Sequence, residues 1–254
     1  MDLGLRDRVV LITGAGGGAG PTVARAFADA GASVALHHRA GSGSAVRAEG
    51  TAAEIVAGGG RAMAVAADLG SSAEVTAMFD QVVGELGPVA VLVTATSAYR
   101  SERFTEITDE SWAAVVDDLL GATFRTCRAA VPGMQAAGWG RIVNVAARSG
   151  LVGVARASHY AAAKAGIVGL TASLAKELGP AGILVNAVAP TQILTVKDGV
   201  PSIPDERAAE MARSIPLRRL ATPEDLASLV VWLGSGANSY VSGETISLSG
   251  GDQR

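Results

Sequence analysis

Short apolar runs and longer amphipathic stretches alternate along the whole chain. Runs such as VVLIT and VAVLVT show no polar alternation, which is typical of strands buried on both faces of a sheet. The stretches between them place apolar residues at helical spacing. Strands are predicted at residues 8–13, 33–38, 61–66, 89–94, 140–146, 183–188 and 244–248, and helices at 19–30, 44–57, 71–86, 108–137, 158–178 and 222–233. This order predicts an α/β fold, in which helices cover both faces of a parallel sheet.

The pattern indicates one domain over residues 1–254, because no internal repeat, low-complexity tract or Pro/Ser-rich linker divides it. One irregular stretch, residues 190–213, contains Gly199, Pro201 and Pro204 and has weak periodicity. Long loops in compact domains are usually functional, so we interpret it as a lid over the substrate. A plain surface insertion is the alternative.

Composition narrows the class of partner and compartment. Hydrophobic residues make up 49% of the 254 residues and charged residues 18%, which is ample for a folded core. The net charge of −3 offers no basic surface for nucleic acid and no cluster for lipid headgroups. A single cysteine, Cys127, excludes an intramolecular disulfide and a multi-thiolate metal site, and we expect it to be a buried small apolar residue. With no signal-like segment and no membrane span in the sequence, we expect a cytoplasmic protein that uses no metal, membrane or nucleic acid.

A glycine-rich segment follows the first predicted strand and precedes a helix. It comprises Gly14, Gly16, Gly17, Gly18, Ala19 and Gly20. Phosphate binding needs backbone amides at close range beside a helix N-terminus, and side chains would block that approach. A tight turn alone would also use glycine, but the strand, loop and helix in this order favour a dinucleotide site.

The end of the second predicted strand indicates which dinucleotide is bound. NAD-selective sites place a carboxylate there, whereas this chain has His37, His38 and Arg39. A cation suits the 2′-phosphate, so we predict NADP(H) in preference to NAD(H), with His38 and Arg39 near the adenosine. The alternative is that Arg39 is a solvated loop residue. Asp68, which ends the third strand, is a candidate partner for the adenine amino group, or a turn residue.

Tyr160 and Lys164 lie four residues apart in a predicted helix, so both side chains point to one face. A neighbouring ammonium favours a phenolate, and we therefore expect Lys164 to lower the pKa of Tyr160 from its reference of about 10. Such a tyrosine is a general acid for a ketone that accepts hydride, or a base for an alcohol.

These features occur together with others in a fixed order. The chain resembles the short-chain dehydrogenase/reductase family over essentially its full length, in the segments Thr13-Gly-x-x-x-Gly18-x-Gly20, Asp68-Leu69, Gly140-Arg-Ile-Val-Asn144, Tyr160-Ala-Ala-Ala-Lys164-Ala-Gly, Val185-Asn-Ala-Val-Ala-Pro190 and Val241-Ser-Gly-Glu-Thr-Ile-Ser-Leu-Ser-Gly-Gly251. The resemblance implies a Rossmann-like doubly wound sheet, a nicotinamide cofactor and a homo-oligomer, either tetramer or dimer. It also implies that Lys164 holds the nicotinamide ribose and that Thr195 contacts the carboxamide. The remaining cofactor contacts are assigned to Leu69, Thr94, Ala95, Pro190, Thr191, Ile193 and Tyr160.

Several positions depart from the family pattern. Ala147 stands where the family carries a carbonyl-binding serine, and Leu119 stands where it carries an asparagine. The Asn-Asn-Ala-Gly after the fourth strand becomes Thr94-Ala-Thr-Ser97, and the Pro-Gly after the sixth becomes Pro190-Thr191. Hydroxyls of Thr96, Ser97, Ser149 or Ser158 could replace the missing donor, although each alone has a structural explanation. We assign substrate contacts to Thr96, Ala147, Ser149 and Gln192.

The sequence therefore predicts an NADPH-dependent ketoreductase with Tyr160 as general acid and Lys164 as its partner. A ketone with an adjacent hydroxyl, as in polyhydroxylated aromatic polyketides, could polarise its own carbonyl. Two alternatives stay open at this point: a degenerate NADP(H)-binding regulator or scaffold, and a reductase or dehydratase acting on a conjugated substrate.

Overall fold

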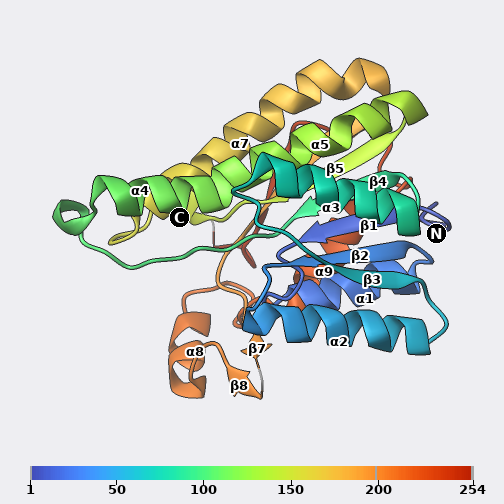
Figure 1. Ribbon diagram of the computed structural model, residues 1–254. Coiled ribbons are helices and arrows are strands. Elements are labelled where there is room, and N and C mark those ends of the chain that lie inside the picture. The colour runs from blue at the N-terminus through green and yellow to red at the C-terminus, as the bar shows by residue number, and fades with distance from the viewer. Residues whose placement is uncertain (1, 198, 253–254) are drawn as a thin grey trace.

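A computed structural model describes residues 2–197 and 199–252. Seven parallel strands form one sheet in the order β3-β2-β1-β4-β5-β6-β9, the doubly wound arrangement that the sequence predicts (Figure 1). The order reverses between β1 and β4. The strands are β1 (Val9–Thr13), β2 (Ser33–His38), β3 (Ala62–Ala66), β4 (Val89–Thr94), β5 (Gly140–Val145), β6 (Ile183–Pro190) and β9 (Thr245–Leu248).

Helices cover both faces of the sheet. In Figure 1, α1, α2 and α9 lie below the sheet, whereas α3, α5 and α7 lie above it. Successive residues of β1 point to opposite faces, so Val10 and Ile12 pack in the lower core and Val9 and Leu11 in the upper. The helices are α1 (Gly20–Asp29), α2 (Gly43–Ala57), α3 (Ser72–Glu85), α4 (Asp109–Val116), α5 (Ala122–Ala137), α6 (Ser149–Val152), α7 (Ser158–Leu178), α8 (Asp205–Ala212) and α9 (Pro223–Leu233).

The prediction of one continuous helix over residues 108–137 is wrong. The chain forms α4, then the π-helical turn η2 (Asp117–Gly121), then α5. The apolar periodicity continues through the π turn, so the sequence pattern does not reveal the extra residue that the turn contains. Single π turns of this kind are frequent at functional sites.

The predicted lid segment contains more regular structure than a loop. It includes the short strands β7 (Val196–Lys197) and β8 (Val200–Pro201) followed by α8. In Figure 1 these elements project from the lower left of the domain. Ile203, Ile215 and Leu220 form a small apolar cluster of their own beside this segment, which gives it a local core.

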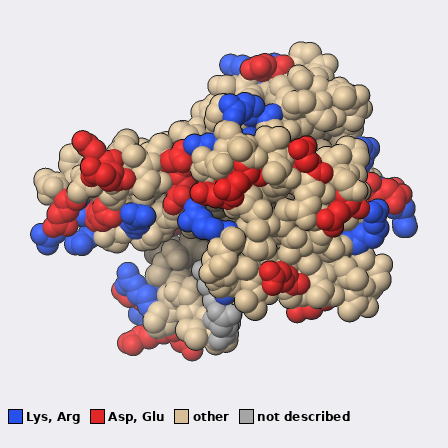
Figure 2. Space-filling model, viewed as in Figure 1, with Lys and Arg blue, Asp and Glu red and all other residues tan. Residues whose placement is uncertain are grey.

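Cys127 is buried, as predicted. The apolar face of α9 contributes Leu226, Val230 and Leu233 to the lower core. Figure 2 shows basic and acidic side chains mixed over the viewed face. Within the part of the chain that is described, no helix has both the length and the apolar character needed to cross a membrane.

Candidate active site

A cleft of about 700 Å³ lies at the carboxyl ends of the central strands. This is the place where open α/β sheets bind ligands, beside the point at which the strand order reverses. The volume falls within the usual range for small-molecule and cofactor sites, about 300–1,000 Å³. The cleft is lined by the glycine loop, the ends of β2 and β3, the loop after β4, and the lid residues Ile193 and Thr195.

The glycine loop is closely packed from several sides. Gly14 has φ of +67°, in the left-handed region that favours glycine. A Cβ on Gly16 would lie 2.0 Å from the carbonyl oxygen of Ser44 at the start of α2, and one on Gly18 would lie 2.7 Å from Thr195 Oγ1. The loop ends in α1, whose N-cap residue Ala19 supplies no side-chain hydrogen bond. The loop therefore fits an anion of the cofactor, which would take the place of a side-chain cap.

His37 connects three strand ends beneath this loop. Gly14 N–H donates to its Nδ1 at 3.0 Å, and its Nε2 lies 3.1 Å from the carbonyl oxygen of Ala67. Since Nδ1 accepts, the proton lies on Nε2 and is donated to Ala67. Burial lowers the pKa of His37 to about 4, so the ring is neutral at neutral pH. Its two ring contacts join the glycine loop to the segment after β3.

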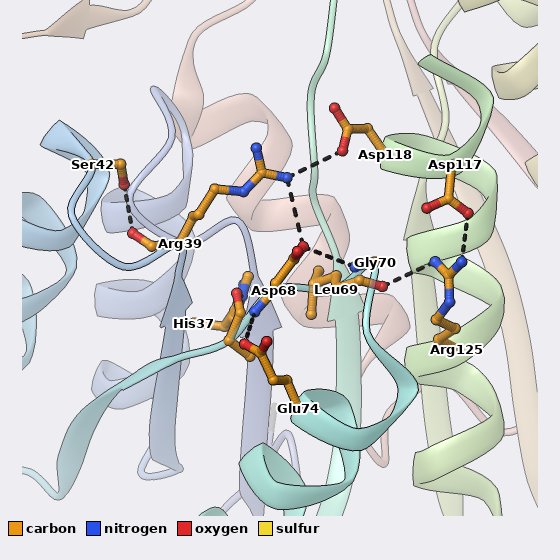
Figure 3. Close-up of polar contacts among 11 residues, drawn as sticks. His37, Arg39, Ser42, Asp68, Leu69, Gly70, Glu74, Asp117, Asp118 and Arg125 are labelled. Carbon is orange, nitrogen blue, oxygen red and sulfur yellow. Dashed lines mark hydrogen bonds and ion pairs between the residues drawn. The ribbon is translucent and has the colours of Figure 1, made fainter. Parts of the chain in front are cut away.

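Arg39 crosses the adenosine end of the cleft (Figure 3). Its Nη2 lies 3.1 Å from Asp118 Oδ1 in the π turn and 3.9 Å from Asp68 Oδ1 after β3. The Arg39 side chain is 62% exposed and so remains accessible to a ligand. Arg39 and Asp118 both line the cleft, and Arg39 lies between the carboxylates of Asp118 and Asp68.

A second arginine joins the π turn to the same strand end. Arg125 Nη1 donates to the carbonyl oxygen of Leu69 at 3.0 Å, and its Nη2 lies 2.5 Å from Asp117 Oδ1 (Figure 3). Leu69 lines the cleft. The adenosine end is therefore closed by side chains from η2, which the sequence pattern did not single out.

Lys164 stands at the other end of the cleft. Its Nζ donates to the carbonyl oxygen of Val145 at 2.7 Å and to that of Thr96 at 3.3 Å, and both of these residues line the cleft. Burial lowers the pKa of Lys164 to about 8. The ammonium lies 5.9 Å from the ring centroid of Tyr160.

Tyr160 differs electrostatically from the expectation. Burial, together with the neighbouring Tyr99 phenol, raises the pKa of Tyr160, whereas the spacing to Lys164 predicts a lowered value. The reason is that desolvation disfavours the phenolate, while the ammonium of Lys164 is directed at two backbone carbonyls. The phenol is therefore protonated at neutral pH, the form that a proton donor requires.

The structure gathers most of the predicted cofactor residues. The cleft lining includes Gly14, Gly17, Gly18, Ala19, Gly20, His38, Arg39, Leu69, Ala95, Ile193 and Thr195. Others lie behind this surface or beside it: Thr94 is buried and donates to Asn144 Oδ1, and Thr191 faces a separate small recess with Leu248. Asp68 accepts the N–H of Gly70, which lines the cleft. Pro190 ends β6.

The four predicted substrate residues differ in their exposure and in whether they line the cleft. Thr96 lines the cleft, Gln192 is exposed, and Ala147 is almost fully buried at 9% exposure. The Oγ atoms of Ser149 and Ser158 are both buried and have no hydrogen-bond partner among the described residues.

Tyr99 and Asp118 are among the cleft residues that the sequence reasoning missed. Tyr99 could have been noticed from its position five residues after Thr94, in the loop that departs from the family pattern. Asp118 gave no such signal, because its direction depends on the π turn. Both line the cleft.

Comparisons with known proteins agree with this architecture. The family model described as enoyl-(acyl carrier protein) reductase matches residues 14–252. The 3-oxoacyl-(acyl-carrier-protein) reductase FabG of Staphylococcus aureus is 36% identical over 241 residues, covering 95% of this chain and 96% of the relative. FabG of Pseudomonas aeruginosa is 34% identical over 249 residues, covering 98% of each chain. A crystal structure from Agrobacterium tumefaciens, described as a gluconate dehydrogenase, has a TM-score of 0.91 at 29% identity and covers 99% of this chain and 98% of its own.

The chain belongs to the short-chain dehydrogenase/reductase family. It is an oxidoreductase with a Rossmann-like fold, and its class uses a nicotinamide cofactor. The family resemblance predicted from the segments is confirmed.

Proposed function

We propose that this protein is an NADPH-dependent ketoreductase in which Tyr160 is the general acid. The observation that carries the proposal is the position of Lys164, whose ammonium rests on the backbone of Val145 and Thr96 at the cleft wall. Tyr160 lies one helical turn before it in α7 and packs against Tyr99, which lines the cleft.

The bound cofactor would supply a hydride to the carbonyl carbon. The glycine loop would hold its diphosphate. Lys164, whose ammonium donates to the carbonyl oxygens of Val145 and Thr96, would hold the nicotinamide ribose. As the carbonyl π bond breaks, the oxygen takes the proton of the Tyr160 hydroxyl and leaves a phenolate. Because burial and Tyr99 raise the pKa of Tyr160, the phenol is ready to donate rather than to accept.

The proposed preference for NADPH rests on Arg39. A 2′-phosphate carries more charge than either Asp118 or Asp68 and would compete for the exposed guanidinium. NADH would leave the Arg39–Asp118 pair in place and gain nothing from it.

For the substrate we propose a ketone beside a group that stabilises its enol or hydrogen-bonds its oxygen. The two FabG relatives are named for 3-oxoacyl groups, which have this character. We regard the chain as an atypical member because the methyl of Ala147 donates no hydrogen bond and Leu119 is fully buried. A hydroxylated aromatic polyketide ketone, which polarises its own carbonyl, is the proposed natural class.

Three further features belong to the same proposal. Residues 190–213 would act as the substrate lid, since Ile193 and Thr195 already line the cleft. We also propose that the protein works in the cytoplasm and as a homo-oligomer, a tetramer or dimer.

The test is NADPH oxidation with a 3-oxoacyl thioester, a hydroxylated aromatic ketone and an α,β-unsaturated thioester. Reduction of a ketone by the wild type should fall by about 10³-fold in Tyr160→Phe, because the proton donor is removed. NADPH affinity should stay the same in that variant. NADPH consumption with the unsaturated thioester alone would indicate an enoyl reductase and not a ketoreductase. NADPH binding without turnover of any compound would indicate a binding protein.

A further inference from the structure

Reduction of a ketone places negative charge on the carbonyl oxygen, and positioned donors that meet this charge contribute strongly to rate. Tyr160 supplies one hydroxyl. An alkoxide oxygen has room for a second donor, and Ala147 offers none. The cleft wall near Tyr160 is the place to look for it.

Several hydroxyls do not fit the position. Those of Ser149 and Ser158 are buried away from solvent, so a substrate in the cleft would not meet them. The Lys164 ammonium is held by Val145 and Thr96. Thr96 and Ser97 also line the cleft, but among the described residues their short side chains make no hydrogen bond or ring contact with Tyr160.

Tyr99 has the required position. It lines the cleft, its side chain belongs to a residue that is 55% exposed, and its ring packs edge-on against Tyr160 with the centroids 5.2 Å apart and the planes at 79°. Edge-to-face packing of this kind holds two aromatic rings in a defined relation. The two phenols come from separate segments, one from α7 and one from the loop between β4 and the 3-10 turn η1 (Phe104–Glu106).

The loop that carries Tyr99 is fixed on both sides of it. Before Tyr99, the carbonyl oxygen of Thr96 accepts from Lys164. After it, Glu102 N–H donates to the carbonyl oxygen of Arg156 at 2.7 Å, and the Glu102 carboxylate accepts from Ser111 Oγ at 2.8 Å. Tyr99 lies three residues from each of these two anchors, Thr96 and Glu102. The loop therefore holds Tyr99 in place while the cleft stays open.

We infer that Tyr99 is a second catalytic tyrosine, which donates a hydrogen bond to the substrate carbonyl oxygen while Tyr160 transfers the proton. Tyr99 keeps its own proton throughout, so the balance of the reaction is unchanged: the carbon gains hydride and the oxygen gains the Tyr160 proton. This inference rests on the proposed ketoreductase function. It is supported by electrostatics, because Tyr99 contributes to the raised pKa of Tyr160, which means that charge on one phenol is felt by the other.

Steady-state kinetics of matched variants test the role. Tyr99→Phe keeps the ring and its packing and removes only the hydroxyl. We expect kcat for the best ketone to fall by about 10²-fold, the cost of one lost oxyanion donor, with NADPH affinity unchanged. Adding Ala147→Ser to Tyr99→Phe should restore at least about tenfold of that loss, because a hydroxyl returns at the position where the family resemblance places the carbonyl-binding serine. Tyr240→Phe is the matched control: Tyr240 is 96% exposed and lies outside the cleft lining, so this variant should change kcat by less than about threefold.

A second measurement does not depend on turnover. The chain has three tyrosines, so the absorbance of tyrosinate on raising pH can be assigned with single Phe variants. In Tyr99→Phe, Tyr160 should ionise at a lower pH than in the wild type. An unchanged titration would show that the two hydroxyls do not interact and would overturn the inference.

The outcomes separate the two proposals. If Tyr160→Phe abolishes ketone reduction while Tyr99→Phe reduces the ketone at the wild-type rate, Tyr99 has no catalytic role and the ketoreductase stands. If Tyr99→Phe loses rate but Ala147→Ser restores none of it, the loss is one of loop structure and the inference fails. If the wild type reduces no ketone although NADPH binds, both proposals fail together.

Discussion

The two ends of the cleft are built from different kinds of group. The nucleotide end consists largely of backbone: Gly16 abuts the Ser44 carbonyl, and the Gly14 N–H is bound by His37. The catalytic end consists of side chains: the Lys164 ammonium donates to two backbone carbonyls, and the ring of Tyr160 packs edge-on against that of Tyr99. Backbone contacts depend on the path of several segments, so a single added methyl disturbs them. A side-chain donor can be exchanged by one substitution.

At the nucleotide end, the largest effect should come from Gly16→Ala. Its Cβ would lie 2.0 Å from a backbone oxygen of α2, so either the loop or α2 must move. We expect NADPH affinity to fall by about 100-fold, consistent with about 1–3 kcal/mol for overpacking. Fluorescence titration of the cofactor measures it. Gly84→Ala in α3 is the matched control, since its Cβ meets nothing within 4 Å, and should leave affinity unchanged. Equal loss in both variants would contradict the packing argument.

Arg39→Ala should next weaken binding of NADPH by about 10- to 100-fold and leave NADH nearly unaffected, because one charge-assisted contact with the 2′-phosphate is lost. Asp118→Asn should act in the opposite direction, tightening NADPH by a few fold, since it frees the guanidinium from its 3.1 Å ion pair. Calorimetric titration with both cofactors measures the two variants side by side. A similar loss for NADH and NADPH in Arg39→Ala would argue that Arg39 only shapes the loop.

The pH dependence probes the catalytic end. Burial lowers the pKa of Lys164 to about 8, so its ammonium is present below that pH and lost above it. We expect kcat/KM for ketone reduction to be level below pH about 8 and to fall by about tenfold per pH unit above it. Lys164→Arg keeps the charge at all accessible pH values. In that variant, if it is active, the alkaline fall should disappear; its persistence would assign the titration to another group.

The smallest effect concerns His37 and stability. Its pKa of about 4 in the folded protein lies below the ordinary histidine value of 6.5, so the neutral ring contributes stability that is present above pH 6.5 and is lost as the pH falls towards 4. His37→Asn can replace the acceptor for Gly14, and His37→Gln can replace the contact with Ala67. Each should be destabilised by about 1–2 kcal/mol in urea unfolding at neutral pH, and His37→Leu by more. Subtracting each variant's pH curve from the wild-type curve should isolate the His37 contribution; a flat difference would refute it.

Much of the fold was readable along the chain because each strand is a local apolar run. The bounds of β2, β4 and α7 agree with the prediction at every residue, and the other strands differ by at most two residues at an end. The glycine loop was also predictable, since a strand, a glycine-rich turn and a helix stand next to one another in sequence. The π turn at residues 117–121 was not, because its extra residue leaves the apolar periodicity unbroken.

By itself, the sequence determined the family, the order of strands and helices, and the presence of a tyrosine and a lysine on one helix face. These depend on neighbours within a few residues or on segments in a fixed order. Only the tertiary structure decided that Arg39 faces Asp118, that His37 supports Gly14, and that Tyr99 packs against Tyr160. Each of these pairs joins segments at least 23 residues apart, and each energy depends on burial and distance that no local pattern encodes. The direction of the Tyr160 pKa shift has the same origin. The helical spacing brings the Lys164 charge near Tyr160, but burial of the phenol determines that its pKa is raised.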